Sequence, residues 1–260
     1  MQRIVSRDNN RIKRLKGLAQ KKVRIRENLF LIEGIKIVEE AMSEGCSIDT
    51  IAVSDSFVSL HSASLEAYEN NGYEITSMPD RLFKSISSLV SPQGILAALQ
   101  MNESSVDSIL EKGKSVVLLD GISDPGNLGT IVRTADAFGF DVLMTGDCVD
   151  IYNPKTVQAT MGSVLRIAHS QFNYSDMDKL KDAGYTFYGF DIDGKNLSED
   201  FSFAEKCALI TGNESNGISA EMKSVCDELV RIPMSGKTES LNAAMAAGIA
   251  MFLAGGYGKI

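Results

Sequence analysis

Three polar segments of the chain combine residue types that could act on a ligand. The first, DPGNLGTIVRTADAFG (residues 124–139), places Arg133 among residues that otherwise suit the core of a helix. The second is TGNESNGIS (211–219), and the third is IPMSGKTESLNAAMAAG (232–248). Amide, carboxylate, hydroxyl and guanidinium groups can bind and orient a polar substrate, so convergence of these segments would make a binding or catalytic site.

These segments do not contain the common cofactor and catalytic motifs. GISDPGNLG fails the GxGxxG spacing of a dinucleotide site, and SGKT (235–238) lacks the glycine that a P-loop needs five positions before Gly236, because residue 231 is Arg. There is no GxSxG, and His61 and His169 lie outside all three segments, which argues against a Ser-His-acid hydrolase. The 4 cysteines and 2 histidines show no metal-ligand spacing, so we expect no metal.

The elements around these segments predict an α/β fold. Strand-like and helix-like runs alternate along the chain, which is typical of a parallel sheet with helices on both faces. The strand candidates are LFLIEG, IDTIAVSD, YEITSMP, GILAALQ, VVLLD, FDVLMTG, RIAHSQF, YTFYGFDI, KCALITG and ELVRIPM. In such sheets ligands bind beyond the carboxyl ends of the strands, so we expect the three polar segments to meet at one edge.

The chain is long enough for two domains. Its 260 residues, 44% hydrophobic and 23% charged, suit a globular protein with ample core. After Gln100 the run MNESSVDSILEKGKS is polar and poorly patterned, which is typical of a linker. We therefore expect a smaller α/β domain over 1–102, a linker over 103–114 and a second domain over 115–260.

The net charge of −8 conceals a basic head. Residues 1–36 carry 11 basic and 3 acidic side chains, a net charge of +8, and the remainder of the chain carries −16. The charges in RIKRLKGLAQKKVRIR alternate with Ile12, Leu15, Leu18, Val23 and Ile25 at near-helical spacing, so one face could pack while the other shows cations. A polyanion is the partner that this head suggests, although a solvated helix or a mobile tail would also carry such charge. The candidate contacts are Arg11, Lys13, Arg14, Lys21, Lys22, Arg24 and Arg26.

Neither end of the chain predicts a membrane segment. The N-terminus MQRIVSRDNNRIKRLK is charged and has no apolar h-region, so it is not a signal peptide. The longest apolar run, AAMAAGIAMFLAGG (243–256), is too short to span a bilayer easily and predicts a buried helix with close backbone packing. We expect a cytoplasmic protein.

Taken together, the three segments closely resemble the signature motifs of the SpoU (TrmH-like) RNA ribose 2′-O-methyltransferases of the SPOUT class. The first resembles the Asn-x5-Arg motif, the second GxE-x2-G, and the third IPM…SLN. Order, spacing and flanking strands agree over about residues 115–258, and the N-terminal part more loosely resembles the substrate-binding module of rRNA-modifying members. The matching residues are Asn127, Arg133, Gly212, Glu214, Gly217, Ile232, Pro233, Met234, Ser240, Leu241 and Asn242.

The resemblance implies a fold, a cofactor and a partner. Unknotted chains are the rule, but this family has a C-terminal trefoil knot whose loops hold S-adenosylmethionine in a bent shape. The family is usually dimeric, with the RNA site completed across the subunit boundary, and no metal is expected. The residues implied in cofactor binding are Thr211, Gly212, Ile232, Met234 and Leu241.

The resemblance also implies catalytic roles. Methyl transfer to a ribose hydroxyl needs an oriented nucleophile, removal of its proton and tolerance of alkoxide charge. Arg133 could stabilise that charge and clamp a phosphate, whereas its guanidinium is a poor proton acceptor. Glu214 could accept or relay the proton, and Asn127, Ser240 and Asn242 would orient the reacting groups. Asn127 and Glu214 could instead stabilise the loops alone.

The sequence departs from the family pattern at one position, and the resemblance leaves more than one substrate and activity possible. Many relatives carry a basic residue where NPKTVQATMGSVLRI (153–167) has Gln158; Lys155 or Arg166 could supply the missing phosphate contact. The N-terminal module favours rRNA as substrate. The alternatives are a tRNA methyltransferase, an antibiotic-resistance methylase, and an RNA-binding protein of the same fold without catalysis.

Overall fold

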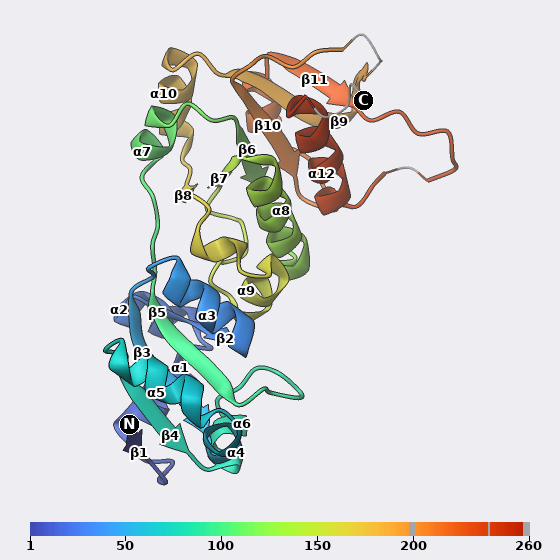
Figure 1. Cartoon of the computed structure of the whole chain (residues 1–260). Coiled ribbons are helices and arrows are strands. Elements are labelled where there is room, and N and C mark those ends of the chain that lie inside the picture. Colours follow the sequence, from blue (N-terminus) through green and yellow to red (C-terminus); the bar gives the residue numbers. More distant parts are fainter. Residues whose placement is uncertain (198–200, 239, 257–260) are drawn as a thin grey trace. The chain divides into compact units, whose positions relative to one another are not determined.

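A computed structural model describes residues 1–197, 201–238 and 240–256 of the chain. The last residues of the expected second domain, 257–260, lie outside the described part. The chain divides into two compact units, which Figure 1 shows. The first comprises Met1–Asn102 and Tyr152–Leu165, and the second comprises Glu103–Ile151 and the chain from Arg166 onward. The chain therefore passes from one unit to the other three times.

The first unit is built on a mixed five-stranded sheet with the order β1-β4-β3-β5-β2. β5 runs antiparallel to β2 and β3, and β4 runs parallel to β1 and β3. Its strands are β1 (Gln2–Arg3), β2 (Leu29–Glu33), β3 (Ile48–Ser54), β4 (Ile75–Met78) and β5 (Ile95–Gln100). Its helices are α1 (Asn10–Gly17), α2 (Lys21–Glu27), α3 (Ile35–Ser43), α4 (Asp55–Leu60), α5 (Ser62–Asn70), α6 (Asp80–Lys84) and α9 (Pro154–Thr160), with a 3-10 turn at Ser163–Leu165.

The basic head forms α1 and α2. One face of these helices packs on the core of the unit as predicted, except that Arg24 is buried in place of Ile25. Ile12, Leu15 and Leu18 are buried in the core of this unit. Ile25 was expected on the same face, but 62% of it is exposed, and its neighbour Arg24 is buried instead. The prediction for Ile25 is wrong because the chain turns between the two helices, which changes the phase of the helical face.

Residues 152–165 join the first unit although they lie between two strands of the second. The ring of Tyr152 packs against Phe30 with centroids 4.6 Å apart, and its hydroxyl accepts the N–H of Asn102 at 2.9 Å. Gln158, on α9, donates from Nε2 to Oγ of Ser88 at 2.7 Å. Gln158 thus binds a loop of the first unit.

The second unit has a six-stranded, wholly parallel sheet with the order β11-β9-β10-β6-β7-β8. This arrangement confirms the predicted α/β class. Its strands are β6 (Val116–Asp120), β7 (Asp141–Met144), β8 (His169–Gln171), β9 (Thr186–Asn196), β10 (Cys207–Gly212) and β11 (Glu228–Arg231). Its helices are α7 (Val106–Glu111), α8 (Pro125–Phe138), α10 (Met177–Asp182), α11 (Ala220–Val225) and α12 (Ala243–Ala254), with a 3-10 turn at Tyr174–Asp176.

Both faces of this sheet are covered. Alternate residues of β6 and β10, such as Leu118 and Ile210, share one apolar cluster with α7, α10 and α11. The other face is covered by α12, which packs on α8 and β10. Helix α7 lies within the stretch expected to be a linker, and its Val106 and Ile109 are buried in this core.

Candidate functional site

The first two polar segments follow neighbouring strands that end at the same level. In the parallel register, Asp120 at the end of β6 lies opposite Gly212 at the end of β10. Beyond β6, the Asp124 side chain caps α8 by accepting the N–H of Asn127 at 2.8 Å, and Pro125 occupies the first turn. The sequence therefore places Asn127 beside the loop that follows β10.

Hydrogen bonds join all three polar segments through their side chains. Nδ2 of Asn127 donates to Oε1 of Glu214 at 2.8 Å, and Nδ2 of Asn242 donates to Oδ1 of Asn127 at 2.9 Å. Oγ of Ser123 donates to the second oxygen of Glu214 at 3.2 Å. We call the set Asn242, Asn127, Glu214 and Ser123 the amide relay.

The direction of the relay is set by the N-terminus of α12. Oδ1 of Asn242 accepts the backbone N–H groups of Ala244 and Met245, at 2.9 and 3.2 Å. Its NH₂ group must then face Asn127, which in turn must present its oxygen to Asn242 and its own NH₂ to the carboxylate of Glu214. One helix cap therefore orients two amides and directs a donor at a charged acceptor.

Glu214 is stabilised in its ionised form. Partial desolvation acts to raise its pKa, but hydrogen bonds from Asn127 and Ser123 outweigh it, and the pKa is lowered from the ordinary value of 4.5. The carboxylate is charged at neutral pH and holds its two partners. A lowered pKa makes it a weaker base than an ordinary carboxylate.

The loop after β10 can form only with glycine at its start. A Cβ on Gly212 would lie 2.1 Å from the backbone carbon of Gly217, and Gly217 itself has a φ of +66°. Asn213 and Gly217 exchange two backbone hydrogen bonds of 2.9 Å. The Asn213 side chain accepts the N–H of Ser215 and donates to the carbonyl of Gly121. These contacts fix the backbone beside Glu214 and bind it to the loop after β6.

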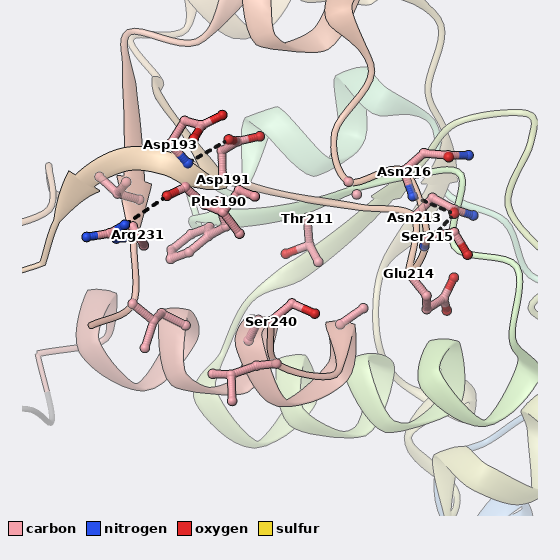
Figure 2. Close-up of a pocket in the computed structure, with 18 of the residues that line it drawn as sticks. Phe190, Asp191, Asp193, Thr211, Asn213, Glu214, Ser215, Asn216, Arg231 and Ser240 are labelled. Carbon is pink, nitrogen blue, oxygen red and sulfur yellow. Dashed lines mark hydrogen bonds between the residues drawn. The ribbon is translucent and has the colours of Figure 1, made fainter. Parts of the chain in front are cut away.

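A cavity of about 410 Å³ opens beside this loop. That volume lies within the roughly 300–1,000 Å³ typical of small-molecule sites. Figure 2 shows Asp191 and Asp193 at one end and Asn213, Glu214, Ser215 and Asn216 at the other, with Thr211 and Ser240 between them. All five residues expected to bind the cofactor line the cavity: Thr211, Gly212, Ile232, Met234 and Leu241.

The five residues expected to be catalytic are distributed around this cavity. Glu214 and Ser240 line it, and Asn127 and Asn242 reach it through the amide relay. Arg133 lies six positions beyond Asn127 on α8, about 9 Å along the helix axis. Its side chain is exposed and makes no hydrogen bond or ion pair with any residue that the structure describes. The structure thus links four of the five and leaves the guanidinium available to a ligand.

Sequence reasoning missed one wall of the cavity. β9 continues past the predicted strand, and residues 190–194 (FDIDG) bulge out of register with β11. Phe190, Asp191 and Asp193 from this bulge, with Lys223 from α11, line the cavity. Two acidic residues followed by Gly194, within a strand-like run, were the available signal, because glycine inside a strand often marks a bulge.

The candidate polyanion contacts of the first unit differ in their exposure and in whether an acidic side chain already pairs with them. Lys13, Lys21, Lys22 and Arg26 are exposed, and Lys13 also forms a 3.5 Å ion pair with Asp8. Two others are paired with acids: Arg11 forms an ion pair with Glu74, and Arg14 forms a bidentate pair with Asp49 at 2.9 and 3.1 Å and also contacts Glu27. Arg26 also contacts Glu27, 2.8 Å away. Pairing with Arg26 and Arg14 lowers the pKa of Glu27.

Arg24 differs from the other six. Only 2% of it is exposed, and its guanidinium donates to the carbonyls of Leu18 and Ala19 at 2.9 and 3.0 Å. These carbonyls lie at the end of α1, where helical partners are missing. Arg24 therefore stabilises the junction between α1 and α2, and its side chain is not presented to a ligand.

Two further site types are absent from the described ranges. Within residues 1–197, 201–238 and 240–256, His, Cys, Asp and Glu form no group of three that could hold a metal ion. No helix in the same ranges is both long and apolar enough to cross a membrane.

Comparisons with known proteins agree with this geometry. Residues 114–252 match the model of the SpoU rRNA Methylase family, and residues 9–97 match the MRM3-like substrate binding domain. The chain is 34% identical over 254 residues to the 23S rRNA (guanosine(2553)-2′-O)-methyltransferase RlmP of Bacillus subtilis, covering 97% of this chain and 98% of the relative. It is 30% identical to a 23S rRNA (uridine(2479)-2′-O)-methyltransferase of Streptomyces viridochromogenes, over 88% and 83% of the two chains.

Solved structures show the same architecture. An AdoMet-bound rRNA methyltransferase from Sinorhizobium meliloti superposes with a TM-score of 0.85 at 29% identity, over 100% of this chain and 98% of that one. The SpoU methyltransferase AviRb from Streptomyces viridochromogenes, in complex with AdoMet, gives a TM-score of 0.86 at 28% identity, over 96% and 98%.

Proposed function

The chain belongs to the SpoU rRNA methylase family, and we propose that it transfers the methyl group of S-adenosylmethionine to a ribose 2′-hydroxyl of 23S rRNA. The observation that carries the proposal is the amide relay, in which Asn242, Asn127 and Glu214 of three separate segments meet beside a ligand-sized cavity. We place this activity in the cytoplasm.

The cavity fits the cofactor in volume and in chemistry. Ile232, Met234 and Leu241 supply apolar walls for the adenine, and the backbone around Gly212 approaches without a side chain. The hydroxyl of Thr211 is buried and has no hydrogen-bond partner among the described residues. A buried polar atom without a partner is costly, and a bound ligand can supply one. When bound, S-adenosylmethionine supplies a methyl group on a sulfonium, which is already a good leaving group.

The chain's own residues would then act on the hydroxyl that accepts the methyl group. Arg133 is exposed on α8, and its guanidinium stays charged, so it can hold an RNA phosphate and stabilise negative charge at the ribose oxygen. Asn127 and Asn242 are fixed in one orientation by the relay. Glu214 keeps Asn127 in place by accepting from its NH₂ group, which supports a positioning role for it at neutral pH.

The first unit would bind the RNA. Lys13, Lys21, Lys22 and Arg26 are its exposed candidate contacts, and cations of this kind bind phosphates without reading sequence. The proposed organisation remains a substrate-binding module over 1–102 and a methyltransferase domain over 115–260. Helix α9, with Lys155 and Gln158, lies with the first unit, and would therefore act with the RNA-binding module.

Two structural features of the family are extended to this chain. One is a homodimer through the methyltransferase domain. Its support is α12, an apolar helix rich in small residues, on which 59% of Met245 is exposed. The other is the C-terminal trefoil knot, in which the loops after β10 and β11 would wrap the cofactor.

The test is methyl transfer from labelled S-adenosylmethionine to total rRNA and tRNA from a strain that lacks this gene, with nuclease mapping. We expect label on one ribose 2′-oxygen of 23S rRNA with the wild type and none with Arg133→Ala. Label in tRNA would favour the tRNA alternative. Tight binding of RNA and cofactor without transfer to either RNA would favour a binding protein of the same fold.

A further inference from the structure

Asp136 lies one helical turn from Arg133 on α8. Residues three and four positions apart are neighbours on the surface of a helix, and the neighbours of Arg133 in this sense are Gly129, Thr130, Asp136 and Ala137. Asp136 is the charged residue among the four. An arginine and an aspartate at this spacing can form an ion pair, which would engage the guanidinium that the proposed function requires for RNA.

The structure shows a different pairing. Nε and Nη2 of Arg166 lie 2.9 and 2.7 Å from Oδ2 of Asp136. Arg166 directly follows the 3-10 turn at Ser163–Leu165 and belongs, like α8, to the second unit. Only 22% of the Asp136 side chain and 34% of the Arg166 side chain are exposed, so water competes less with this pair than with a fully exposed one. Asp136 is thus bound by Arg166, and Arg133 makes no ion pair with it.

This pairing determines the charge beside Arg133. Asp136 and Arg133 are the charged residues of α8, so Arg133 is the cation of this helix that could replace Arg166 as the partner of Asp136. With Arg166 present, the three side chains carry a net charge of +1. Without it, Arg133 and Asp136 would cancel, and the carboxylate would repel a phosphate or an alkoxide held by Arg133.

Direct binding of a phosphate by Arg166 is less well supported. An arginine binds an anion bidentately through two N–H groups on one edge of its guanidinium. In Arg166, Nε and Nη2 on one such edge both contact Asp136. The guanidinium of Arg133, by contrast, makes no hydrogen bond or ion pair within the described ranges, and so offers all of its donors to a ligand.

We infer that Arg166 is a positioning residue for methyl transfer: by binding Asp136, it keeps this carboxylate from pairing with Arg133 and leaves the guanidinium of Arg133 free for RNA. The inference rests on the proposed function, in which Arg133 holds a phosphate and stabilises charge at the ribose oxygen. Arg166 acts through Asp136 and does not touch the RNA.

The test is a double-mutant cycle between Arg166 and Asp136. The value of kcat/KM for methyl transfer to 23S rRNA from a strain that lacks this gene is measured for wild type, Arg166→Ala, Asp136→Asn and the double variant. We expect Arg166→Ala alone to lower kcat/KM about 10-fold, because the freed carboxylate pairs with Arg133 and repels the RNA anion. In the Asp136→Asn background, the same change should cost less than about 2-fold. Urea unfolding confirms that all four proteins are folded in the assay, so that stability alone does not change the rate.

A second measurement shows whether Arg166 acts through Arg133. Binding of the same RNA to the full chain is followed at several salt concentrations. Arg133→Ala and Arg166→Ala should each weaken binding and reduce the slope of log K against log salt by up to about 1. Adding Arg166→Ala to Arg133→Ala should change neither quantity further. The control is Lys179→Ala, which removes a cation of α10 that pairs with Asp107 and Asp176, and it should bind as the wild type does.

Other outcomes overturn the inference in distinguishable ways. A further loss of affinity when Arg166→Ala is added to Arg133→Ala would show that Arg166 contacts the RNA itself. If Asp136→Asn does not rescue Arg166→Ala, Asp136 does not compete for Arg133. Wild-type protein that binds the RNA without methyl transfer would refute the proposed function, and the binding series would then decide alone whether Arg166 acts through Arg133.

Discussion

Nδ2 of Asn242 donates to Oδ1 of Asn127 at 2.9 Å, although the two residues lie 115 positions apart in the chain. Asn242 is the N-cap of α12, and Asn127 lies in the first turn of α8. The start of one helix therefore determines the orientation of a side chain at the start of another. Asn127 in turn donates to Glu214. The side-chain amide of Asn242 therefore both caps α12 and orients the polar side chains of the site.

Asn242→Asp should separate these two roles. Aspartate caps a helix about as well as asparagine, so thermal unfolding should change little. It cannot donate to Asn127, however, and it brings a second carboxylate toward Glu214. For Asn242→Asp we expect the rate of methyl transfer to fall about 10-fold or more, while the melting temperature stays close to that of the wild type. Asn242→Ala, the control, loses both the donor and the cap and should also cost about 1 kcal/mol of stability. An Asp variant with the wild-type rate would show that the relay is not needed.

Glu214 should stabilise the fold in a pH-dependent way. Its pKa is lowered in the folded state from an ordinary value of 4.5, although burial opposes the shift. Its stabilising contribution is therefore fully present above pH 4.5 and is lost as the pH falls through the folded pKa. Glu214→Gln keeps an acceptor oxygen without the charge. Urea unfolding should show wild type more stable than this variant at pH 7, with a smaller difference near pH 3. A difference that grows on acidification would contradict the lowered pKa.

Much of the second unit could be predicted because its signals are local or topological. The apolar run VVLLD forms β6 (Val116–Asp120), because a strand covered on both faces needs continuous apolar residues. The meeting of the polar segments could also be predicted, since parallel strands present their carboxyl ends at one edge. The bond between Asn242 and Asn127 could not, because it depends on where two helices begin relative to each other in three dimensions.

The features that sequence reasoning missed depend on irregular backbone. FDIDG reads as the end of a strand, yet close approach of Gly194 to β11 turns it into a cavity wall with Asp191 and Asp193. In the first unit, the turn between α1 and α2 brings Arg24 inward and leaves Ile25 exposed. Periodicity assumes an unbroken helix or strand, so it fails where the chain bends.

Asp141, at the start of β7, should limit stability at neutral pH. It is buried, its Oδ2 has no hydrogen-bond partner among the described residues, and burial raises its pKa from 3.8. The folded state therefore binds the proton more tightly, and stability falls as the pH rises from 3.8 through the folded pKa. Asp141→Asn should gain about 1 kcal/mol over wild type at pH 7 and less near pH 4. Unfolding in urea at both pH values measures this, with Asp182→Asn as an exposed control. A gain that is larger at pH 4 would contradict the raised pKa.

Substitutions of Arg24 and Lys22, which both lie on α2, should affect different properties: the first should reduce stability and the second should weaken RNA binding. Arg24→Ala removes the donor to the carbonyls of Leu18 and Ala19, so we expect a loss of about 2 kcal/mol in urea unfolding. Lys22 is exposed, so Lys22→Ala should keep stability within about 0.5 kcal/mol. If Lys22 contacts a phosphate, this variant should bind rRNA fragments more weakly, and the slope of log K against log salt should decrease by about 1. Unchanged affinity and slope for Lys22→Ala would exclude this side chain from the RNA surface. If Arg24→Ala is as stable as the wild type but binds RNA more weakly, Arg24 belongs to the RNA-binding surface, which would contradict its burial in the structure.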